Sequence, residues 1–168
     1  MPLEELNCYG AGITDFSPLE GKKLVVLNLG GTTRKPDLNL IATLPLRKLR
    51  LNECPVTDLT PLKGLSLDVL EIGSANITDL SPLRGMPLGF LVCPSNPIRS
   101  YEPLKDLPAL VDLFCDVSTL EDVKVLRTLP MLKTINGKSA TILLDQLEKQ
   151  FKLPTKEGTN GIAPVTTP

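Results

Sequence analysis

Four cysteines are the residues of this chain best suited to carry chemistry. A catalytic cysteine or serine usually works beside a histidine that accepts its proton, and the 168-residue sequence contains no histidine. Zinc sites built from cysteine use close spacings such as C-x-x-C, and no two of the four cysteines lie that near each other. Neither common glycine-rich phosphate-binding motif is present. The sequence therefore predicts no enzyme, no catalytic residues and no bound cofactor.

A recurring aspartate is the second chemical feature, and it occurs at Asp15, Asp58, Asp79 and Asp122. A column of carboxylates could bind calcium, which takes oxygen ligands. The alternative is local, because an aspartate in a stretch such as I-T-D-L-S-P can accept hydrogen bonds from nearby backbone amides in an Asx turn. The second interpretation needs no ion, so we expect no metal site.

The aspartates recur because the whole sequence repeats. The copies start at Leu3, Leu24, Leu46, Leu67, Leu88 and Leu110, with a partial copy at Leu132. Their spacing of 21 or 22 residues is typical of solenoid repeats, and each copy opens with L-x-x-L-x-L or a close variant. This alternation places the leucines on one side of a short strand and the other residues on the opposite side. A single copy cannot bury its leucines, so the copies must stack into a ladder of parallel strands.

On these motifs the sequence resembles the leucine-rich repeat family, and segments such as DLSPLRGMPL are similar to those of bacterial members. The resemblance implies an α/β leucine-rich repeat solenoid, with a curved parallel β-sheet on the concave face, short helical or 3₁₀ turns on the convex face and a C-terminal helical cap. The implied organisation is repeats over 1–137, a capping helix over 138–152 and a linker or loose tail over 153–168. In LTPLKG and its sister segments we expect Ser17, Thr60 and Ser81 to be helix N-caps, each followed by proline.

The cysteines occupy structural positions within the repeat. Cys8, Cys93 and Cys115 fall in the inward column that Leu29, Leu51 and Ile72 occupy in sister copies. These three thiols should therefore pack as small apolar groups. The family places Asn or Cys at the position of Cys54, where the side chain satisfies backbone groups inside the loop.

The outward residues of the strands have no structural duty in the repeat and are free to bind a partner. Their first column is Glu5, Val26, Lys48, Val69, Phe90 and Asp112, and their second is Asn7, Asn28, Arg50, Glu71, Val92 and Phe114. The first half of this face is largely polar. In the second half, Val69, Phe90, Val92 and Phe114 lie on neighbouring strands. They should form one apolar patch, and such patches usually mark interaction sites.

We predict that this patch binds a protein or peptide partner, with Lys48 and Arg50 at its rim. Two alternatives stay open: the tail over 153–168 folds over the patch, or a neighbouring domain covers it. As a whole the chain is then a non-catalytic protein-interaction module or scaffold. Its alternative is a regulatory or recognition fragment of a larger enzyme or receptor, for example a kinase-linked repeat region.

The composition of the chain limits the kinds of partner it can bind and indicates its cellular location. Lys and Arg number 18 against 19 Asp and Glu, so the chain lacks the basic excess typical of nucleic-acid or anionic-membrane binding. Its apolar runs fall short of the roughly 20 residues that span a bilayer, and the opening MPLEELNCYG does not resemble a signal peptide. Unpaired core thiols favour a cytoplasmic location, and the alternative is an extracytoplasmic location if the chain is a fragment of an exported protein.

The first copy begins almost at Met1, without a capping segment before it. Leu3, Leu6 and Cys8 should therefore leave an apolar edge strand uncovered. We expect self-association through this strand, or a gain in stability when upstream sequence covers it.

Overall fold

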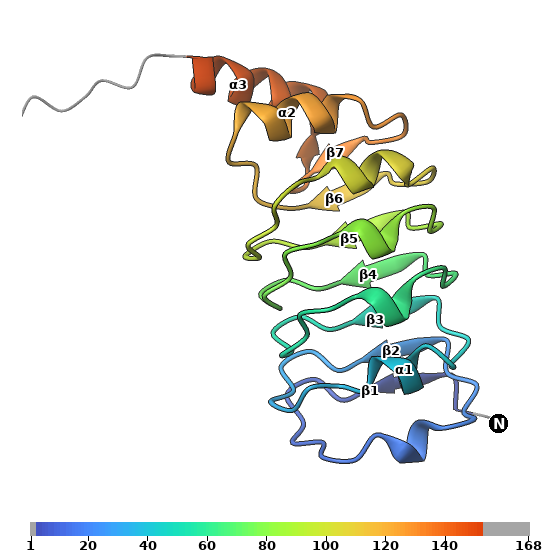
Figure 1. Cartoon of the computed structure of the whole chain (residues 1–168). Helices are drawn as coiled ribbons and strands as arrows, with labels where there is room; N and C mark the ends of the chain where they lie inside the picture. The colour runs from blue at the N-terminus through green and yellow to red at the C-terminus, as the bar shows by residue number, and fades with distance from the viewer. Residues whose placement is uncertain (1–2, 153–168) are drawn as a thin grey trace, which may run out of the picture.

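Eight short strands, stacked in chain order, form a single curved sheet in the computed structural model, which describes residues 3–152 (Figure 1). The strands are β1 (Glu5–Asn7), β2 (Val26–Asn28), β3 (Lys48–Arg50), β4 (Val69–Glu71), β5 (Phe90–Val92), β6 (Asp112–Phe114), β7 (Thr134–Ile135) and β8 (Lys138–Ser139). Strands β1 to β7 run parallel, and β8 returns antiparallel to β7. The predicted fold class, a leucine-rich repeat solenoid, is confirmed.

Each strand pairs with the next at equivalent positions of the repeat. The central leucines form one row: Leu6, Leu27, Leu49, Leu70, Leu91 and Leu113. From Leu27 onward every member of this row is 0 % exposed. Full burial of a leucine side chain stabilises the fold by about 1.5 to 3 kcal/mol, so the row is a main source of stability. It also fixes the register, because a slip of one residue would turn every leucine to the other face.

Helical turns cover the other side of the stack (Figure 1). They are η1 (Ser17–Leu19), α1 (Leu38–Ile41), η2 (Thr60–Leu62), η3 (Ser81–Leu83), η4 (Glu102–Asp106), α2 (Leu120–Arg127) and α3 (Ala140–Lys152). Two copies have an α-helix in place of the common 3₁₀ turn, the second with α1 and the sixth with α2, and the fifth has the longer 3₁₀ turn η4. The second copy has the short helix α1, whose N-cap Asp37 accepts the backbone N–H groups of Asn39 and Leu40. In the fifth copy Tyr101 is buried, and its hydroxyl donates to the carbonyl of Asp116 at 2.7 Å.

The prediction that Ser17, Thr60 and Ser81 are N-caps was wrong. Each is the first residue of its 3₁₀ turn, and no side chain of the preceding residue caps that turn. The aspartate two residues before makes the capping bond, as when Asp58 Oδ1 accepts the N–H of Thr60 at 2.8 Å. The N–H groups of Leu62 and Lys63, which a Thr60 cap would accept, are bonded to the carbonyls of Leu59 and Thr60 instead. The glycine stop is present, since Gly64 has a positive φ of 78°.

The C-terminal end of the stack is closed by a hairpin and two helices (Figure 1). Asn136 and Gly137 have positive φ angles of 52° and 73°, the conformation of a tight two-residue turn between β7 and β8. The helix predicted over 138–152 therefore begins only at Ala140, because Lys138 and Ser139 pair with β7. The tail predicted over 153–168 lies outside the described residues.

The other end of the stack is open within residues 3–152. Strand β1 pairs only with β2 in this range, and Leu3 is 55 % exposed. Leu6 and Cys8 are partly buried, unlike their counterparts in the inner copies. None of the helices described is long and apolar enough to cross a membrane.

Candidate functional site

Strands β4, β5 and β6 bring the predicted apolar residues together on the outward face of the sheet. Val69 pairs with Phe90 across β4 and β5, and Val92 pairs with Phe114 across β5 and β6. The rings of Phe90 and Phe114 meet diagonally, with centroids 5.6 Å apart and planes tilted by 44°. All four side chains are half-buried. We call these four residues the apolar patch.

The local sequence explains why these side chains face outward. In LGFLVC and LVDLFC the leucines take the inward positions, so Phe90, Val92 and Phe114 have only the outward side available. An aromatic pair of this kind stabilises by about 0.5 to 1.5 kcal/mol beyond the area it buries. The two rings therefore support each other while one side of each remains accessible to a partner.

The two rim cations differ in their environment. Arg50 Nε lies 2.7 Å from Glu71 Oε1, and the other carboxylate oxygen accepts the Asn52 amide at 2.9 Å. Arg50 is thus already paired. Lys48 is exposed and has no ion pair among the residues described. Of the two, Lys48 is the charge that an incoming partner would meet unpaired.

Asp112 lies at the border of the apolar patch, and its side-chain hydrogen bond was not predicted from the sequence. It lies beside Phe90 in the first outward column, and its Oδ1 accepts the Thr134 hydroxyl at 2.6 Å. Thr134 comes from the partial copy that starts at Leu132, and strand β7 places it next to Asp112. Extending the outward column one copy further would have found it. A carboxylate therefore stands at one side of the apolar patch and Lys48 at the other.

The cysteines are structural, as predicted. Cys54 is buried, with its Sγ donating to the Leu29 carbonyl at 3.0 Å and lying 3.3 Å from Thr32 Oγ1. Burial raises the pKa of Cys93 well above its ordinary value and that of Cys115 to about 12. Burial disfavours the thiolate, so these two thiols are poor nucleophiles and poor metal ligands.

The aspartates act in local turns, which confirms the Asx-turn interpretation. Asp15, Asp58 and Asp79 each accept the backbone N–H two residues on, at 2.8 Å. Hydrogen bonds from this residue lower the pKa of each aspartate. The larger cause is the Ser17 N–H at Asp15, and it is the side-chain hydroxyl of Thr60 at Asp58 and of Ser81 at Asp79. Asp122 instead belongs to the capping box of α2 with Thr119. Residues 3–152 contain no group of three side chains placed to hold a metal ion.

The in-register leucine rows, the turns and the outward face define a repeat solenoid of the protein-interaction type. No family model matches the sequence, and no curated protein matches it. Among solved structures, the chain is similar to internalin C2 from Listeria monocytogenes, with 33 % identity and a TM-score of 0.71 over 84 % of this chain and 67 % of that one. The chain belongs to the leucine-rich repeat family.

Proposed function

We propose that this protein is a non-catalytic module that binds a protein or peptide partner through the apolar patch. The observation that supports the proposal is the Phe90 and Phe114 pair, which lies half-exposed on the side of the sheet that the repeat leaves free. Buried aromatic anchors carry a large share of interface energy, and apolar exposure of this kind commonly marks a binding surface.

In this proposal an apolar side chain of the partner packs against the two rings and displaces water from them. Lys48 orients the partner by attracting an acidic group, which acts mainly on the rate of association. In this proposal Arg50, the other residue predicted at the rim, acts through the patch itself. Because it is bonded to Glu71, it holds the polar border of the patch in place rather than contacting the partner first.

A library of random peptides displayed on phage tests this function, since it requires no known partner. Peptides selected on the unmodified protein are measured against Phe90→Asp and Phe114→Asp, with Asn28→Asp as the matched control. Asn28 is also an outward strand residue, but it lies on the polar half of the face. We expect the two phenylalanine variants to lose binding and Asn28→Asp to retain it. Peptides that bind all three variants equally would contradict the proposal.

The alternative role, as a recognition region of a larger enzyme or receptor, uses the same patch and differs only in what is attached to it. The same selection, repeated on a longer protein carrying this module, should return peptides of the same type. The cytoplasmic location stays a prediction.

Self-association through β1 is a second proposal, supported by the 55 % exposure of Leu3 at the open end. An exposed strand edge beside apolar side chains is a template for pairing with another chain. We expect Leu3→Lys to shift the sedimentation of the protein toward the monomer. A monomer at all concentrations before the change would rule this proposal out.

A further inference from the structure

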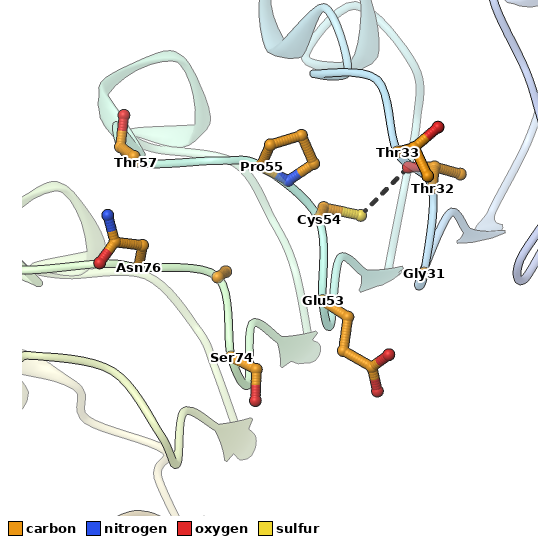
Figure 2. A pocket seen from close by; sticks show the side chains of 10 residues that line it. Gly31, Thr32, Thr33, Glu53, Cys54, Pro55, Thr57, Ser74 and Asn76 are labelled. Carbon is orange, nitrogen blue, oxygen red and sulfur yellow. Dashed lines mark hydrogen bonds between the residues drawn. The ribbon is translucent and has the colours of Figure 1, made fainter.

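A depression lies at the edge of the sheet, where the chain leaves β2, β3 and β4 (Figure 2). Its volume is about 530 Å³, within the range of small-molecule sites. Its lining comes from equivalent loops of three consecutive copies: 31–33, 53–57 and 74–76. The apolar patch lies on other side chains, so this depression is separate from the site described above.

A residue with left-handed backbone follows each of strands β1 to β5 at the same position of the repeat. After the first two strands, the residue that enters the left-handed region is a glycine, Gly10 or Gly31. At the equivalent position of the next copies stand Glu53 and Ser74, with φ of 60° and 53°. Side chains at positive φ carry a conformational cost that glycine avoids, and such residues cluster at functional sites. In the two copies at the depression this position therefore carries a polar side chain, Glu53 or Ser74, and both belong to the lining (Figure 2).

The walls of the depression are held rigidly by bonds between copies. Cys54 Sγ donates to the Leu29 carbonyl, which ties the third loop to the second. The Asn96 side chain accepts the backbone N–H groups of Ala75 at 3.1 Å and Ile77 at 2.8 Å, which ties the fourth loop to the fifth. A preformed site loses little entropy when a ligand binds.

The chemistry of the lining selects a class of ligand. Polar groups come from the hydroxyls of Thr33, Thr57 and Ser74, the amide of Asn76 and the carboxylate of Glu53, and no lysine or arginine is among the lining residues. Such a set matches a ligand rich in hydroxyl groups and disfavours an anion.

We propose that this depression binds a neutral carbohydrate unit. Glu53 and Asn76 bind its hydroxyl groups, and Ser74 and Thr57 add further hydrogen bonds.

Nuclear magnetic resonance titration with maltose, cellobiose and chitobiose tests this site, with glucuronic acid as the anionic comparison. We expect saturable shifts in the backbone amide signals of Thr33, Thr57 and Asn76 with at least one neutral probe. We also expect weaker binding of glucuronic acid. The absence of saturable shifts with all three neutral probes, or shifts confined to another surface, would overturn the proposal.

Glycine substitutions separate binding from folding, because they remove the side chain and relieve the strain together. Glu53→Gly and Ser74→Gly should weaken sugar binding about tenfold or more and leave the unfolding temperature unchanged or higher. Ser95→Gly is the matched control: Ser95 has a φ of 57° at the same repeat position, but it is outside the lining. It should leave binding unchanged. Equal binding by Glu53→Gly, Ser74→Gly and the control would contradict the assignment.

Discussion

The inward and outward side chains of strand β5 differ in burial and in how much their residue type varies between copies. Leu91 faces inward, is 0 % exposed, and belongs to a row that is leucine in all six full copies. Phe90 and Val92 face outward, half-buried, in columns whose members vary between charged, amide, aliphatic and aromatic residues along the chain. The same backbone thus supports both a uniform inward side and a variable outward side. In the proposed function, stability and recognition are carried by alternate residues of one strand, so mutations should separate them.

The largest expected effect is on the inward side. Leu91→Ala removes buried methyl groups from a fully packed row and leaves a cavity, so it should lower the free energy of unfolding by about 2 to 5 kcal/mol. Urea denaturation followed by circular dichroism measures this loss. A change below about 1 kcal/mol would mean that the leucine row is not a main source of stability, which would contradict the role given to the inward residues.

The corresponding outward change should act mainly on binding. Phe114→Ala should weaken the affinity for a selected peptide by about 1 to 3 kcal/mol, since it removes one of two aromatic anchors. The free energy of unfolding should fall by only about 1 kcal/mol, through loss of the ring pair with Phe90. Isothermal titration calorimetry and urea denaturation on the same preparation give both numbers. A stability loss as large as that of Leu91→Ala would show that Phe114 belongs to the core.

Repetition explains how much of this face could be predicted from the sequence. Six copies in phase determine which residues face inward, because any other register would expose the leucines, and so Phe90 and Phe114 were correctly placed on neighbouring strands. Choices between nearby bonding partners were not predictable in this way. Asp58 makes the side-chain bond at the start of its turn, and it accepts the N–H of Thr60 itself, the residue predicted to be the cap. The left-handed backbone of Glu53 and Ser74 was not predicted either, because their residue types do not indicate it.

A smaller effect is expected at the rim. Lys48→Glu reverses the unpaired charge beside the apolar patch, so it should slow association with an acidic peptide by up to about tenfold and change the rate of dissociation little. Arg50→Gln should act differently, because it breaks the bond to Glu71 and loosens the border. Stopped-flow association at low and high salt tests this. Equal effects of the two variants would remove the distinction drawn between them.

The smallest expected effect concerns the aspartate turns on the convex side. The folded-state pKa values of Asp15, Asp58 and Asp79 are lowered, so their ionised forms stabilise the fold above their unfolded pKa near 3.9. That contribution is lost as pH falls through the lowered values, which predicts lower urea midpoints at pH 3 than at pH 6. Asp58→Asn keeps the turn acceptor and should show a weaker pH dependence. The same dependence in both proteins would exclude Asp58 as a source.

The central claim is that Phe90 serves recognition and Leu91, next to it on the same strand, serves the fold. Its most direct test is Phe90→Asp, measured for cooperative thermal unfolding and for binding of the selected peptides. The account predicts a protein that unfolds cooperatively near the temperature of the unmodified chain and no longer binds. Loss of the fold would show that Phe90 is part of the core or is covered by another segment, and a folded variant that keeps every peptide would contradict the claim directly.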